Sequence, residues 1–124
     1  MIYIEENEMG IISFNKSIIN QLISESVKPW IETDKLRLSN EKEIETSDAG
    51  IYICLHISLA IGESMSEVIN HMIDFLSDSI IESMECSIDD IVIVLDDMFT
   101  KNGNSVPRNI QYSYSESKAS GAHY

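Results

Sequence analysis

Hydrophobic and polar residues alternate over one long stretch near the middle of the chain. From Ile51 to Ile61 every odd position is Ile or Leu, the period of two of a strand with one buried face. Gly62 ends this strand, and Ser64 with Glu67 has the form of a helix capping box. The following aliphatic residues recur every three or four positions and predict a helix laid on the sheet. They are Met65, Val68, Ile69, Met72, Leu76, Ile80 and Met84.

The residues before this unit predict a strand, a helix and a second strand. Residues 10–14 have the pattern of a short first strand. The aliphatic spacing from Ile18 to Val27 predicts a helix, and Pro29 is expected to stop it. Residues 35–38 alternate and predict a short strand near the edge of the sheet.

The complete pattern predicts an α+β fold with the order β-α-β-β-α-β. Residues 39–49 are polar and are expected to form a surface loop, whereas residues 91–95 are apolar on both faces and predict an inner strand. A two-layer sandwich, with about four strands and two helices on one face, buries both helical stripes. We expect a flexible acidic N-terminus at 1–9, one α/β domain at 10–99 and a disordered polar tail at 100–124.

Composition and charge narrow the function. The 124 residues fit a single domain, and Lys+Arg 8 against Asp+Glu 21 gives a net charge of -13. Between Lys42 and Lys101 there is no Lys or Arg, which disfavours nucleic acid and anionic lipid as partners. The longest charge-free apolar run, 49–62, is shorter than the roughly 20 residues that cross a bilayer, and the N-terminus has no secretory pattern. Cys54 and Cys86 are therefore expected to be free thiols of a cytoplasmic protein.

The chain contains no recognisable catalytic or metal-binding motif. Four residues offer zinc-ligand chemistry without the short paired spacings of zinc sites: Cys54, His56, His71 and Cys86. The acidic pairs at 89–90 and 96–97 lack a glycine-containing calcium loop and are interpreted as solvated strand ends. Neither a Gly-x-Ser-x-Gly elbow nor a glycine-rich phosphate loop is present. We therefore predict no enzymatic activity, no cofactor and no metal.

The even positions of the long strand suggest an interaction surface. From Tyr52 to Ala60 these positions carry no carboxylate and no Lys, although the chain is rich in charge. An uncharged sheet face tends to be buried against another copy or another protein. The residues expected to make this contact are Tyr52, His56, Ser58, Val92 and Val94.

Taken together, these patterns resemble the alkaline-shock-protein family of Gram-positive bacteria, small proteins of the envelope stress response. The resemblance extends from Gly10 to Leu95. It rests on the glycine and the Ile-Ser pair in 10–14, on the long alternating strand that ends at Gly62, and on the helix and Val/Ile strand that follow. Two features depart from the family, because Lys28-Pro29-Trp30 replaces a small Gly-Val turn and the polar positions are less basic.

The resemblance implies a non-enzymatic adaptor or scaffold at the cytoplasmic side of the membrane. Members of the family self-associate or are held by a membrane-anchored partner protein, and some are linked to control of fatty-acid synthesis. The alternative hypothesis is a small acidic regulator that docks residues 63–97 on a basic metabolic enzyme, such as one of fatty-acid synthesis. That contact should weaken with salt, whereas an apolar interface should persist.

Overall fold

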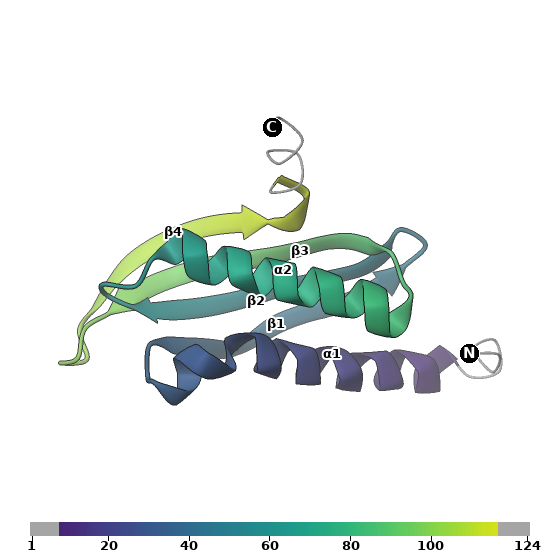
Figure 1. Cartoon of the computed structure of the whole chain (residues 1–124), viewed down its shortest axis with the longest axis horizontal. Helices are drawn as coiled ribbons and strands as arrows, with labels where there is room; N and C mark the ends of the chain where they lie inside the picture. Colours follow the sequence, from purple (N-terminus) through teal and green to yellow (C-terminus); the bar gives the residue numbers. More distant parts are fainter. Residues whose placement is uncertain (1–7, 117–124) are drawn as a thin grey trace.

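Two long helices and four strands make up the part of the protein that the computed structural model describes, residues 8–116, with side chains from Lys16 onward. A single helical turn follows at 114–116. In chain order the elements are α1 (Glu8–Glu32), β1 (Leu36–Ser47), β2 (Gly50–Ala60), α2 (Met65–Met84), β3 (Ile88–Phe99) and β4 (Ser105–Ser113) (Figure 1).

The four strands form one mixed sheet in the order β1-β2-β3-β4. β1 and β2 are antiparallel, β2 and β3 are parallel, and β3 and β4 are antiparallel. Parallel neighbours need a crossover, which α2 supplies between β2 and β3. Both helices cover the same face of the sheet (Figure 1). The predicted α+β class, with four strands and two helices on one face, is confirmed.

The hydrophobic core lies between the helices and this face. In β2 the side chains at odd positions from Ile51 to Leu59 are at most 2% exposed, as the alternation predicts. Ile69, Met72 and the other inward residues of α2 pack against them in one cluster. The expected cap is also present, since the Ser64 hydroxyl accepts a hydrogen bond from the backbone N–H of Glu67 at 3.4 Å.

The N-terminal prediction of a strand is wrong. Residues 10–14 belong to α1. A short segment next to an established helix can extend the backbone hydrogen bonding of that helix, whereas a short strand is stable only when it pairs with another strand. Pro29 also lies inside α1 rather than ending it. α1 ends at Glu32; Asp34 in the turn that follows has a left-handed φ of 59°, and the N–H of Lys35 donates a hydrogen bond to the carbonyl of Trp30 at 2.7 Å.

The polar loop expected at 39–49 is mostly strand. β1 continues to Ser47 through an irregularity between Leu38 and Lys42, and Ile44 points into the core. The strand is polar because it lies at the edge of the sheet, where charged side chains protect against pairing with other chains. The hairpin to β2 needs Gly50, since a Cβ there would lie 2.4 Å from the carbonyl oxygen of Ser87.

The polar tail expected at 100–124 contains the fourth strand. β4 pairs with β3, and its Ile110 and Tyr112 pack against the core, so tertiary pairing stabilises a segment with weak local strand signals. The observed order is α-β-β-α-β-β, which corrects the expected β-α-β-β-α-β. Residues 1–7 of the expected flexible N-terminus, and residues 117–124, lie outside the described part of the chain.

Candidate functional site: the open face of the sheet

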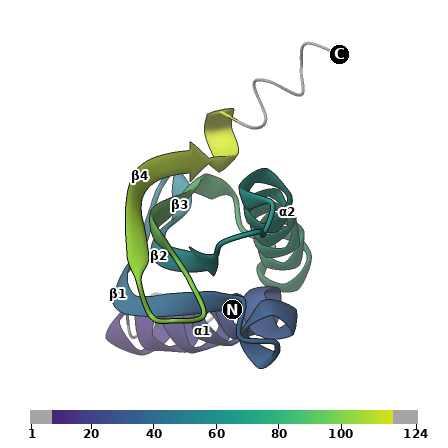
Figure 2. The ribbon, with the colours of Figure 1, turned by 90° about the vertical axis from the view of Figure 1, so that its left-hand side faces the viewer.

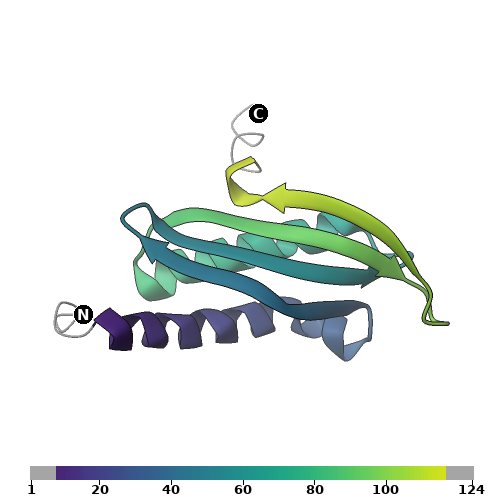
Figure 3. The same cartoon turned by 180° about the vertical axis from the view of Figure 1, so that it is seen from behind.

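The face of the sheet opposite α1 and α2 carries the candidate site. Within residues 8–116 neither helix lies over it, as the view from behind shows (Figure 3). We call this surface the open face. The even positions of β2 project onto it, together with the residues that lie beside them on β1 and β3.

All five residues expected to contact a partner lie on the open face. The register of the parallel pair sets Val92 beside Cys54 and Val94 beside His56. Cys54 and Val92 are 8% and 7% exposed, so they form the covered centre of a narrow stripe. Tyr52, His56, Ser58 and Val94 are half-buried around it. The structure thus brings together residues from two strands that are distant in the sequence. For example, His56 of β2 contacts Asp96 of β3, which lies 40 positions further along the chain.

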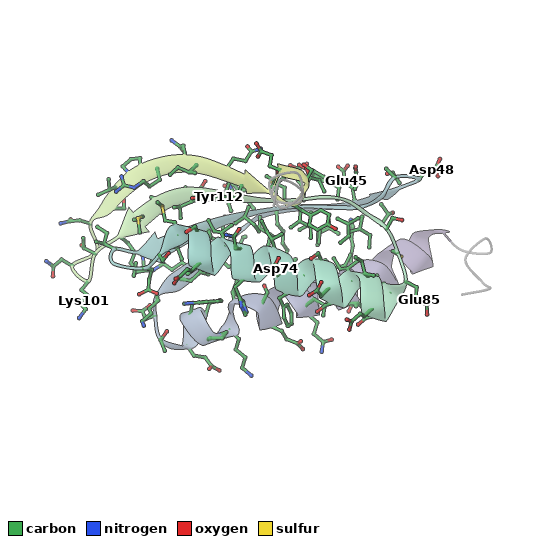
Figure 4. The ribbon with its side chains drawn as sticks, turned by 45° about the horizontal axis from the view of Figure 1, so that its top comes forward. Glu45, Asp48, Asp74, Glu85, Lys101 and Tyr112 are labelled. Atoms are coloured by element: carbon green, nitrogen blue, oxygen red, sulfur yellow. The ribbon has the colours of Figure 1, made fainter. Side chains whose placement is uncertain are left out.

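The open face is acidic, which corrects the expectation of an uncharged surface. Only the residues of β2 itself lack charge. Neighbouring strands contribute five carboxylates against one cation: the register places Glu43, Glu45, Asp90 and Asp97 beside open-face residues of β2, Asp96 bonds His56, and Arg37 of β1 lies beside Ser58. Glu45 is seen near the hairpin end of the sheet (Figure 4). These carboxylates form what we call the acidic border of the stripe.

Two of these carboxylates hold polar groups of the stripe. His56 Nδ1 lies 3.0 Å from Asp96 Oδ1, and the Ser58 hydroxyl donates a hydrogen bond to Asp97. An irregularity in β3 between Leu95 and Asp97 lets both acidic side chains reach this face. The imidazole and the hydroxyl are therefore oriented before any partner binds.

A shallow hollow of about 300 Å³ beside the stripe brings a thiol and an imidazole together. It is lined by Glu41, Lys42, Glu43, Cys54 and His56. A cysteine, a histidine and a carboxylate can form a nucleophilic site when the thiol is activated. Here burial raises the pKa of the Cys54 thiol, and the negative charges of Glu43 and Asp96 raise it further, which outweighs a hydrogen bond with Tyr52. The thiol stays protonated near neutral pH, the opposite of activation.

Tyr52 shows the same electrostatic environment. Burial raises the pKa of its hydroxyl, and Cys54, Glu43 and Asp90 add to the increase. The Ser58 hydroxyl donates to Asp97 rather than to His56, so the serine–histidine pair of a catalytic triad is not formed. The arrangement suits recognition better than covalent chemistry.

The four residues with zinc-ligand chemistry do not converge. Cys54 and His56 lie on the open face, whereas the His71 ring lies on the helix side, 5.1 Å from the ring of Trp30. Cys86 follows α2, and its Sγ hydrogen-bonds the carbonyl of Met84 at 3.2 Å. Among the described residues no group of three His, Cys, Asp or Glu is placed to hold a metal ion.

The acidic border was missed because its residues were interpreted as loop or strand ends. A signal was nevertheless present, since Glu41, Glu43 and Glu45 alternate with Lys42 and Ile44. That period of two predicts an edge strand with one acidic face. The contribution of Asp97 had no such signal, because it depends on the irregularity in β3.

Comparisons with protein family models, with curated proteins and with solved structures find no match. The resemblance to the alkaline-shock-protein family stays a prediction, and its first motif, the strand expected at 10–14, lies in α1. In the described range, neither α1 nor α2 is long and apolar enough to cross a membrane.

Proposed function

We propose that this protein is a non-enzymatic adaptor that binds a partner protein through the open face. The observation that supports this is the stripe of Cys54, Val92 and their half-buried neighbours, on a sheet face that neither helix covers. The stripe is bordered by carboxylates. A covered apolar centre with a charged border is the usual anatomy of a protein–protein interface.

The charge of the open face favours a basic partner. β2 and β3 contribute no Lys or Arg to the open face, because residues 43–100 contain none, and the five carboxylates outnumber Arg37 of β1. Complementary charges steer partners together and exclude proteins of the wrong sign. We therefore propose that the partner presents Lys and Arg around an apolar centre. A basic metabolic enzyme, the partner in the alternative hypothesis of an acidic regulator, would meet this description.

Face-to-face self-association would bring two acidic borders together. Like charges across an interface cost several kcal/mol in unfavourable cases. Self-association, which the resemblance implies, is accordingly proposed to use another surface of the chain. The setting that the resemblance implies, an envelope stress response at the cytoplasmic side of the membrane with a membrane-anchored partner, belongs to the same proposal.

Co-purification from the native host tests the adaptor proposal. His56→Glu adds a carboxylate to the centre of the open face and should remove the bound protein. His71→Glu makes the same change on the exposed side of α2 and should leave binding intact. Both variants are first checked for folding by circular dichroism. Retention of the same partner by His56→Glu would contradict the proposal.

A salt series on the same complex separates its apolar and ionic contributions. Exposed charge pairs are screened when the Debye length falls to about 3 Å at 1 M salt. A complex held by the acidic border should dissociate steeply as the salt concentration is raised to 1 M. Persistence at high salt would indicate that the stripe around Cys54 and Val92 dominates the contact.

A further inference from the structure

A groove lies at the end of the sheet where three connections of the chain meet. These are the α1–β1, β2–α2 and β3–β4 turns, and Figure 2 looks onto this end. The volume of the groove is about 590 Å³, a size typical of small-molecule sites. We call it the end groove. Its lining includes Lys35, Arg37, Ala60, Ile61, Phe99 and Lys101.

The end groove collects positive charge in an acidic protein. Three of the chain's eight Lys and Arg residues, Lys35, Arg37 and Lys101, line it, although the net charge is -13. Lys101 projects at this end, away from Asp48 and Glu85 at the other (Figure 4). Lys35 and Arg37 precede residues 43–100, which contain no Lys or Arg, and Lys101 follows them. Only the fold therefore brings the three cations together.

Two of these cations have no carboxylate partner in the part of the chain that the structure describes. Asp34 and Glu63 also line the groove, and Lys35 Nζ lies 3.9 Å from Glu63. Over the described residues, neither Arg37 nor Lys101 forms an ion pair. Their charges are therefore available to an anionic ligand, while Lys35 is already paired.

Stacking holds the guanidinium of Arg37 in place. Its central carbon lies 3.8 Å from the centroid of the Phe99 ring, which is itself only 5% exposed. A guanidinium stacked on an aromatic ring keeps its N–H donors free at the edge of its plane. Those donors match the two oxygens of a carboxylate, a geometry that strengthens the contact.

We propose that the end groove binds a small organic monoanion in which a carboxylate is joined to an apolar group. The carboxylate bonds Arg37 and Lys101, and the apolar group covers the exposed side chain of Ile61 beside Ala60. A monoanion fits better than a phosphate dianion, because Asp34 and Glu63 line the same groove and repel additional negative charge. This site goes beyond the proposed docking of a protein on the open face and does not depend on it.

Titration of the full chain followed by amide ¹H–¹⁵N spectra tests the proposal. The probes are hexanoate, hexan-1-ol as the neutral analogue of the same length, and inorganic phosphate. Hexanoate should give saturable shifts at residues 33–37, 60–63 and 99–101, with a Kd on the order of 1 mM. Hexan-1-ol and phosphate should each bind at least about tenfold more weakly, because each lacks one of the two required features.

Variants assign the effect to the groove. Arg37→Gln and Lys101→Gln should each weaken hexanoate about tenfold. Arg108→Gln removes an exposed cation of β4 outside the groove and should leave the affinity unchanged. Lys101 lies in an exposed turn, so Lys101→Gln still tests the role of the groove if Arg37→Gln disturbs the packing of Phe99. Equal affinity for hexan-1-ol or phosphate, shifts outside the groove, or unchanged binding by both groove variants would overturn the proposal.

Discussion

The two faces of β2 differ sharply although they belong to the same eleven residues. The odd side chains are aliphatic and at most 2% exposed, packed under the helices, whereas the even side chains on the open face are mostly half-buried, with Cys54 covered at their centre. One face contributes to the hydrophobic core and the other carries oriented polar groups such as His56 and Ser58. The difference teaches that one strand can bury its odd positions in the core and present polar groups at its even positions, residue by residue.

The largest expected effect is on the helix side. Leu55 is fully buried, and Leu55→Ala should lower the free energy of unfolding by about 2–5 kcal/mol through lost burial and the cavity left behind. Val94→Ala on the open face should cost about 1 kcal/mol or less, since Val94 is only half-buried. Urea unfolding of both variants measures these free energies. Equal losses of stability in the two variants would contradict the distinction between the two faces.

A smaller effect is expected from titration of the open face. The pKa of Cys54 is raised in the folded state, so the unfolded chain loses its proton first as pH rises. The stability associated with the protonated thiol is complete below the unfolded pKa, near 9.0, and is lost as pH rises from there through the folded pKa. Urea unfolding from neutral pH to pH 11 should therefore show a steeper decline for the wild type than for Cys54→Ala.

Val92→Ala is the matched control for this pH dependence. Val92 lies beside Cys54 and is similarly buried, but it does not titrate. Its variant should be less stable at every pH while keeping the wild-type slope. Tyr52, whose pKa is also raised, adds to the decline in all of these proteins. An identical slope in Cys54→Ala and the wild type would contradict the expected role of the thiol.

The smallest effect on stability is expected at the acidic border. Glu43 and Glu45 are exposed on the edge strand, and changing both to Gln should alter the free energy of unfolding by less than about 0.5 kcal/mol. The same double variant should weaken binding of the basic partner and reduce its salt dependence. Changing Glu25 and Glu82, which are exposed on the helices, to Gln provides the control. Partner affinity that responds equally to both pairs would remove the special role of the border.

The region from Ile51 to Met84 was predictable because its signals are local. Alternation in β2, the cap at Ser64 and the stripe of α2 each involve neighbours within a few residues, and the structure confirms all three. The placement of Tyr52, His56 and Ser58 on one face followed from the same alternation, whereas strand register placed Val94 beside His56. β1 was predicted only over residues 35–38 and β4 was missed, because edge strands are polar and depend on pairing with β2 and β3.

Periodicity and composition alone established the α+β class, the buried face of β2 and the excess of negative charge. These properties depend on local backbone geometry and on the sum of charges, both of which are written along the chain. Only tertiary pairing placed Asp96 and Asp97 against His56 and Ser58, and only the meeting of three turns brought Arg37 to Lys101. Such contacts join distant residues through strand register and irregularities, which no short stretch of sequence encodes.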